Sequence, residues 1–128
     1  MRVDIAWWDL DGTPQTIDSL REHLSDGTAA AWRDVPGLRL KFWMADPEHN
    51  RWGAVMLWET DRPADLPPNR AAQLIGGPPT HRTRFDVEAA VEGGAPVLPQ
   101  LDGTGPVFTT SAATAVSNPG DLEPCTNT

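Results

Sequence analysis

Polar and apolar side chains alternate along the first ten residues, and a period of two is typical of a β-strand with one buried face. We expect this strand over residues 2–10, ending at the turn Asp11-Gly12. From residue 16 to residue 32 the apolar side chains recur instead at steps of three and four, which predicts a helix. The apolar face of the first strand carries Val3, Ile5 and Trp7.

Two further alternating stretches, residues 38–44 and 52–59, flank turn-forming residues at 46–50 and therefore predict a β-hairpin. Several prolines interrupt the chain after this hairpin, so that a second helix fits best at residues 69–75. The last alternating stretch, residues 81–92, predicts a fourth strand. The order of elements is then strand, helix, strand, strand, helix, strand.

This order is that of the split β-α-β, or ferredoxin-like, arrangement. We therefore predict an α+β fold whose four-stranded antiparallel sheet carries both helices on one face. Alternation would direct Val3, Ile5 and Trp7 toward the helices. The opposite, helix-free face would then be rich in tryptophan, and because such a face usually meets a partner, we expect a homodimer packed sheet against sheet. The residues expected on this free face are Arg39, Lys41, Trp43, Met56, Trp58, Arg84 and Asp86.

The composition of the chain changes at Gly93. From there to the end the sequence contains no Lys, Arg or His, but five Gly and five Pro, a composition that disfavours helix. We therefore divide the chain into a folded domain, residues 1–92, and a Gly/Pro/Thr-rich C-terminal tail, residues 93–128, which is extended or mobile.

The net charge of −8 excludes several classes of partner. Such a charge repels phosphate backbones and anionic lipid, so we expect neither nucleic acid nor a membrane as a partner. No stretch reaches the roughly 18–20 apolar residues of a membrane helix, and acidic residues come too early for a secretory signal. With Cys125 as the only cysteine, neither a disulfide framework nor a paired-cysteine zinc site can form. We expect a cytoplasmic protein.

The segment from Val35 to Thr60, VPGLRLKFWMADPEHNRWGAVMLWET, resembles the central hairpin of YdhR-like monooxygenases. These proteins belong to the dimeric α+β barrel superfamily, alongside the antibiotic-biosynthesis monooxygenases. The resemblance implies a homodimeric barrel that oxygenates an aromatic or polyketide-like metabolite without a cofactor. The matching positions are Pro36-Gly37-Leu38, Lys41, Trp43, Asn50, Gly53 and Phe85-Asp86-Val87.

A second motif competes with this interpretation. Residues 5–13, IAWWDLDGT, resemble the strand and DxDGT loop of haloacid-dehalogenase-like phosphatases, in which Asp9 would be the nucleophile and Asp11 a general acid beside magnesium. That chemistry also needs a distant lysine and a further acidic pair, and the only lysine, Lys41, lies in a different strand. The simpler interpretation is that Asp11-Gly12 forms a turn.

Three polar residues lie at strand ends that we expect at one edge of the sheet: Asp9, Glu59 and His81. If the first and third strands run parallel and the fourth antiparallel, these side chains converge at the mouth of the cleft between sheet and helices. A carboxylate beside an imidazole is a general acid–base pair, in which His81 would transfer the proton. The alternatives are three solvated strand ends, or a divalent metal site with open positions; we predict no metal.

The six tryptophans, in a chain without tyrosine, suggest the walls of a site for a flat, apolar ligand. The residues expected to line it are Trp7, Trp32, Phe42, Leu57 and Phe85. Lys41 and Trp43 belong to the family motif but would face the dimer interior, where Asp4 or Asp86 could pair with the amine.

No recognisable motif for a flavin or nicotinamide cofactor is present. We therefore predict a cofactor-independent monooxygenase that deprotonates a phenol-like substrate before the resulting carbanion reacts with dioxygen. The same acid–base cleft would serve a cyclase or an isomerase, and a non-catalytic module that binds a small hydrophobic molecule is a further alternative. A polar trio beside an aromatic pocket favours catalysis, whereas a closed apolar cleft favours binding.

Overall fold

The computed structural model of the protein describes residues 1–94 and 105–106. The chain divides into two compact units, Met1–Glu92 and Gly93–Thr128. The expected extended or mobile tail, residues 93–128, therefore lies almost entirely outside the described residues. All elements of the fold described below belong to the first unit.

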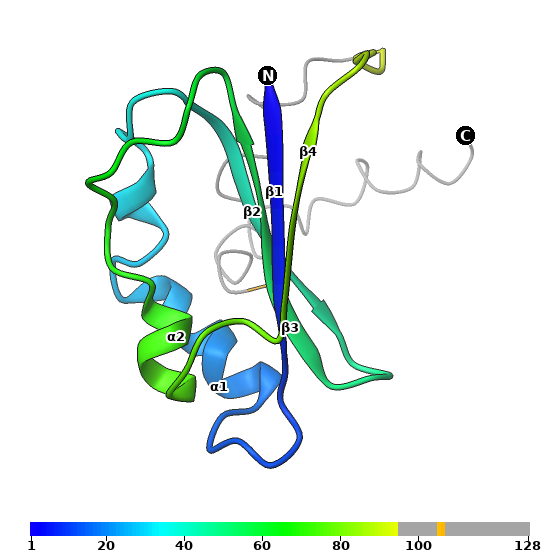
Figure 1. Ribbon diagram of the computed structural model, residues 1–128. Coiled ribbons are helices and arrows are strands. Elements are labelled where there is room, and N and C mark those ends of the chain that lie inside the picture. The colour runs from blue at the N-terminus through cyan, green and yellow to red at the C-terminus, as the bar shows by residue number, and fades with distance from the viewer. Residues whose placement is uncertain (95–104, 107–128) are drawn as a thin grey trace, which may run out of the picture. The chain divides into compact units, whose positions relative to one another are not determined.

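The first unit contains one four-stranded sheet with short helical segments on one side of it (Figure 1). The strands are β1 (Arg2–Asp9), β2 (Leu38–Asp46), β3 (Arg51–Trp58) and β4 (His81–Asp86). The helical segments are the α-helices α1 (Ile17–Glu22) and α2 (Arg70–Ile75) and the 3-10 helices η1 (His23–Ser25) and η2 (Ala30–Trp32). Neighbouring strands are antiparallel, in the order β2-β3-β1-β4. The predicted α+β class with a four-stranded antiparallel sheet is confirmed, and it is compatible with a ferredoxin-like arrangement.

The first helix begins where the apolar spacing predicts, but it is much shorter than expected. Its start is stabilised by a capping box, in which Thr16 Oγ1 accepts a hydrogen bond from the Ser19 N–H and Ser19 Oγ accepts one from the Thr16 N–H. The helix α1 ends at Glu22, so the prediction of one helix as far as Trp32 is wrong. Gly27 adopts a φ of +99° and interrupts the helical path.

The second helix lies within the range that the prolines leave open. The side chain of Asn69 caps its start by accepting a hydrogen bond from the Ala72 N–H at 3.0 Å. At the other end Gly76 takes a left-handed conformation with a φ of +99°, which ends the helix. Local sequence therefore determines both ends of α2.

The last strand is shorter than its alternation suggests. We expected it to reach residue 92, but β4 ends at Asp86. Its sheet neighbour β1 begins at Arg2, and the final backbone pairing joins the Val87 N–H to the Met1 carbonyl. The alternating pattern of the sequence thus continues beyond the last residue that pairs with β1.

The helices cover the face of the sheet opposite to the one we expected. The buried cluster near α1 and α2 is Trp8, Leu10, Leu20 and Trp52, and the buried cluster near η2 is Trp32, Val35, Met56 and Trp58. Placing Trp43, Met56 and Trp58 on the helix-free face is therefore wrong. Alternation identifies the residues that share a face. Because both faces of this sheet carry large apolar side chains, the period of two does not show which face the helices cover.

The other side of the sheet, which we call the open face, carries no helix of the first unit. Its apolar side chains are Val3, Ile5, Trp7, Leu40, Phe42, Met44, Val55, Leu57 and Phe85. Two of these are well exposed, Phe42 at 44% and Phe85 at 57%. A bulge between Leu38 and Leu40 shifts the alternation of β2, so that Leu38 packs beneath the helices while Leu40 lies on the open face.

Gly53 lies where β1 and β3 approach too closely for a side chain. A Cβ atom there would meet the carbonyl oxygen of Ala6 and would lie 2.8 Å from the Cβ of Trp7. We expect Gly53→Ala to lower the free energy of unfolding by about 1–3 kcal/mol, because the two strands would have to move apart. Chemical denaturation measures this, with Gly77→Ala as the control, since no atom lies within 4 Å of that position. An unchanged midpoint in Gly53→Ala would contradict the close approach.

Candidate functional site

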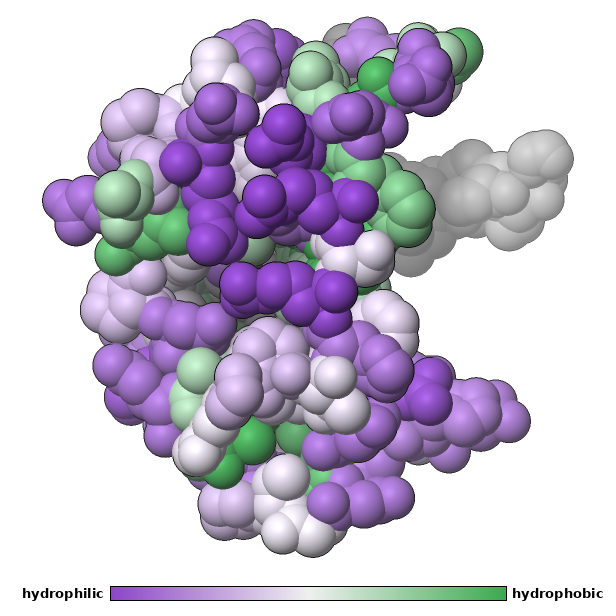
Figure 2. Space-filling view, in the orientation of Figure 1, coloured by the Kyte–Doolittle hydropathy of each residue, from purple (hydrophilic) through white to green (hydrophobic). Residues whose placement is uncertain are grey.

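The helix-covered face of the sheet has two buried clusters that the partly buried Trp43 joins, with a gap beside this residue. Ala6 and Ala54 pair across β1 and β3 in this gap, and both remain partly exposed although they lie on the two central strands. Figure 2 shows the surface recessed between the part of the molecule that holds α1 and α2 and the part around η2. We call this place the central recess, with Ala6 and Ala54 as its floor.

Lys41 extends from β2 over the helix-covered face, at the border of the central recess. It lies directly across from Met56, and its Nζ is 3.3 Å from the ring centroid of Trp32 and 4.9 Å from that of Trp43. Trp43 follows Lys41 by two residues on the same strand, whereas Trp32 reaches the amine from η2. The amine is thus held between two indole rings that come from different parts of the chain.

Burial between these rings lowers the pKa of the Lys41 amine from its ordinary 10.5 to about 7. Among the residues that the structure describes, no carboxylate forms an ion pair with it. The attraction between an ammonium and the indole faces limits the shift. At neutral pH a large fraction of this amine is therefore unprotonated and can accept a proton, which is the state a general base needs.

In the sheet register the carboxylate closest to Lys41 is that of Asp4. Met56 on β3 lies between the two residues, across from Lys41 on β2 and across from Asp4 on β1. Asp4 is only 5% exposed, and its Oδ1 accepts a hydrogen bond from Arg84 Nε at 2.9 Å. Arg62 Nη1 lies 3.8 Å from Oδ2, an oxygen that accepts no hydrogen bond among the described residues. Two arginines therefore neutralise Asp4, which a buried carboxylate requires.

The expectation that Asp4 or Asp86 pairs with Lys41 is thus wrong. Asp4 is engaged by arginines, and Asp86 pairs with Arg2 at 3.6 Å. Both carboxylates lie on strands that are separated from β2 by at least one other strand. In the sheet register Arg84 lies directly across from Asp4 and Arg2 directly across from Asp86, so arginines are the nearer partners.

The three residues expected to form the acid–base cluster do not converge. Because β1 and β3 are antiparallel, Asp9 lies across from Arg51, whereas Glu59 follows β3 at the opposite end of the sheet. Asp9 Oδ1 accepts a hydrogen bond from Arg51 Nε at 3.0 Å, and Glu59 Oε2 accepts one from Arg39 Nη1 at 2.7 Å. The prediction failed because it took the first and third strands as parallel, although the hairpin between β2 and β3 reverses the direction.

His81 lies on the open face, not in the cleft beneath the helices. It pairs with Trp7 across β4 and β1, and their rings are stacked with centroids 4.8 Å apart. The neighbouring Thr80 accepts a hydrogen bond from the backbone N–H of Asp9. Asp9 and His81 are therefore at the same end and on the same face of the sheet, but the carboxylate is bound to Arg51.

The aromatic set predicted to line one pocket is divided between two surfaces. Trp7, Phe42, Leu57 and Phe85 lie together on the open face, whereas Trp32 lies on the helix-covered face beside Lys41. The sequence pattern favoured a structural role for Lys41 and did not reveal its place in a candidate site. The sequence did contain one indication of this role: Lys41 is the only lysine of the chain, and Phe42 and Trp43 follow it in the same strand.

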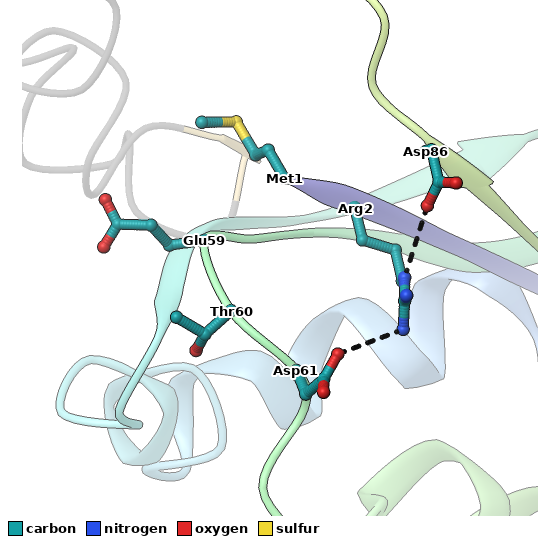
Figure 3. A pocket seen from close by; sticks show the side chains of 6 residues that line it. All are labelled: Met1, Arg2, Glu59, Thr60, Asp61 and Asp86. Carbon is teal, nitrogen blue, oxygen red and sulfur yellow. Dashed lines mark hydrogen bonds and ion pairs between the residues drawn. The ribbon is translucent and has the colours of Figure 1, made fainter.

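A polar pocket lies at the end of the sheet where β1 begins (Figure 3). It is lined by Met1, Arg2, Glu59, Thr60, Asp61 and Asp86. Arg2 extends between two carboxylates, 3.4 Å from Asp61 and 3.6 Å from Asp86. These ion pairs are exposed, so they contribute little to stability. Within residues 1–94 and 105–106, no three His, Cys, Asp or Glu side chains group closely enough to hold a metal ion.

The carboxylates of the phosphatase-like motif are bound to the hairpin turn. Asp9 is bound to Arg51, and Asp11 Oδ1 accepts a hydrogen bond from Asn50 Nδ2 at 2.8 Å. The backbone N–H of Leu10 donates a further bond to the Asn50 carbonyl, at 2.9 Å. Gly12 has a φ of +81°, as a tight turn requires. These contacts favour a structural role for the motif.

Comparison of the chain with protein-family models and with curated proteins finds no match. Among the described residues, no helix is both long and apolar enough to cross a membrane.

The lowered pKa of Lys41 makes stability depend on pH. Between about pH 7 and pH 10.5 the unfolded chain binds the proton that the folded chain has lost, so the free energy of unfolding rises with pH. We expect wild type to gain about 2 kcal/mol relative to Lys41→Met between pH 7 and pH 9, at roughly 1.4 kcal/mol per pH unit. Urea denaturation at both pH values measures this difference. If the difference does not change with pH, the amine has an ordinary pKa.

Proposed function

We propose that the protein is a cofactor-independent monooxygenase for a small, flat, aromatic or polyketide-like molecule, with Lys41 as its general base. The observation that carries this proposal is an amine with a pKa near 7, held against the rings of Trp32 and Trp43. An unprotonated amine beside aromatic walls has the properties needed to remove a proton from a bound aromatic substrate. The resemblance of the surrounding hairpin to monooxygenases supports the reaction class.

The proposed reaction begins when Lys41 Nζ takes a proton from an activated CH2 group of a phenol-like substrate. The electron pair left on the substrate carbon bonds to dioxygen, and Lys41 returns its proton to the peroxide oxygen. Cleavage of the O–O bond with loss of the second hydrogen of the carbon releases water and leaves a carbonyl group. One CH2 group and one O2 thus become one C=O group and one H2O.

This proposal transfers the role of the base from His81 to Lys41. His81 stacks on Trp7 on the open face, and the carboxylate of Asp9 is bound to Arg51. Lys41 lies beside aromatic rings on the covered face, and its pKa of about 7 is in the range where proton transfer by a general base is most effective.

Oxygen uptake with anthrone, a tricyclic ketone with an activated CH2 group, tests the proposal. We expect uptake without added metal or cofactor, rising as the pH passes through about 7 because Lys41 loses its proton. Lys41→Met should lower the rate by about 10²–10⁴-fold, whereas His81→Ala, the control, should retain it. Full activity in Lys41→Met would exclude Lys41 as the base. Conversion without oxygen uptake would indicate a cyclase or isomerase, and binding without conversion a ligand-binding module.

We also propose that two copies pair through their open faces to form a dimeric α+β barrel. The ion pair on this face, Asp9 and Arg51, lies at one end, so contact at the centre does not require these two charges to leave water. Four strands spaced about 4.8 Å apart, each some eight residues long, span roughly 500 Å². Two such faces would bury about 1,000 Å², which reaches the lower limit of a specific interface.

Light scattering at micromolar concentration tests the dimer. We expect a mass of twice 13.9 kDa for the wild type. Phe85→Asp should give the monomer, because it places a charge among the apolar side chains of the open face. Gln73→Asp on the exposed side of α2 is the control and should remain dimeric. A monomeric wild-type protein would contradict the proposed pairing.

A further inference from the structure

An arginine for which the described residues supply no partner borders the central recess on the side opposite to Lys41. Arg82 lies across from Ala6 and Arg84 across from Asp4, so both extend from β4 over the helix-covered face. Arg82 is exposed, and among the described residues it has neither an ion pair nor a hydrogen-bonded side-chain partner. Figure 2 shows hydrophilic side chains gathered along this edge of the molecule.

The charges at this edge are unbalanced. Arg62 and Arg84 both approach the single carboxylate of Asp4, at 3.8 and 2.9 Å, and Arg82 brings a third positive charge. With Arg2 and its two carboxylates, Asp61 and Asp86, at the end of the same edge, one net positive charge remains, on a chain whose net charge is −8. A positive edge on an acidic protein attracts anions, and this edge borders the central recess, with Lys41 at its other border.

We propose that Arg82 binds a carboxylate group of the substrate, which is therefore an aromatic acid. This inference rests on the proposed function, since it concerns the same recess. The guanidinium of Arg82 would bind the carboxylate through two parallel hydrogen bonds, the geometry in which arginine is most effective. The aromatic part of the substrate would lie over Ala6 and Ala54, with its reacting carbon toward Lys41.

The sheet sets the length of such a substrate. Arg82 is on β4 and Lys41 on β2, so three strand spacings and two residues along the strand separate them, about 16 Å between backbones. Arg82 is long enough to reach inward from the edge strand, whereas the Lys41 amine lies between Trp32 and Trp43 at the border of the recess. A flat molecule of about two or three fused rings with a carboxylate at one end fits between them.

Fluorescence quenching of the tryptophans measures binding of two matched probes, 2-naphthoate and its uncharged analogue 2-naphthamide. At low salt we expect the wild-type protein to bind the carboxylate about five- to tenfold more tightly than the amide. Arg82→Gln should abolish this preference. Arg21→Gln removes the same charge from α1, where Arg21 pairs only with Asp18 among the described residues, and should keep the preference. Arg82→Gln should also fold normally, which its thermal unfolding would verify.

Equal affinity for the two probes in the wild type, or a preference that persists in Arg82→Gln, would overturn the assignment of Arg82. So would the failure of both probes to bind. The result is distinguishable from failure of the proposed function, because binding is measured without turnover. Lys41→Met should keep the preference for the carboxylate while losing oxygen uptake. If the wild type prefers the carboxylate but consumes no oxygen, the Arg82 site stands and the monooxygenase proposal fails.

Discussion

The helix layer of this protein is too small for the sheet that it covers, and the rest of the structure depends on this mismatch. The helices α1 and α2 have six residues each, whereas the central strands β1 and β3 have eight. The α-helices reach one end of the covered face, and η2 reaches the other. The buried side chains therefore form two clusters in place of one continuous core, and the centre of the face stays partly open over Ala6 and Ala54.

Tryptophan suits a core of this kind, because each indole ring buries a large area with one residue. Trp43 packs against both clusters and so links the two halves of the core. Trp8 also connects the sheet to the segment after α2, since its Nε1 donates a hydrogen bond to the Gly77 carbonyl at 3.0 Å. The same rings bring Lys41 out of water, so the packing that stabilises the fold also lowers the pKa of its amine.

Much of the fold could be predicted because it depends on local chemistry. The hairpin, the start of α1 at Thr16 and the short helix after Asn69 all follow from turn residues, caps and spacing. The candidate site was predicted less well. Asp9 and Glu59 were expected side by side, but their positions depend on strand direction, and the two side chains lie at opposite ends of the sheet. Lys41 was expected at a dimer interface and lies beneath the helices.

The sequence by itself determined which residues share a face of the sheet, where the chain turns, and that one lysine stands in an aromatic strand. Only the tertiary structure decided which of two apolar faces the helices cover and which partners each charge meets. The physical reason is that alternation has the same period on both faces, so the choice depends on the total area each face can bury. The environment of Lys41 follows from that choice, because Trp32, which lies outside the sheet, reaches the amine only on the covered face.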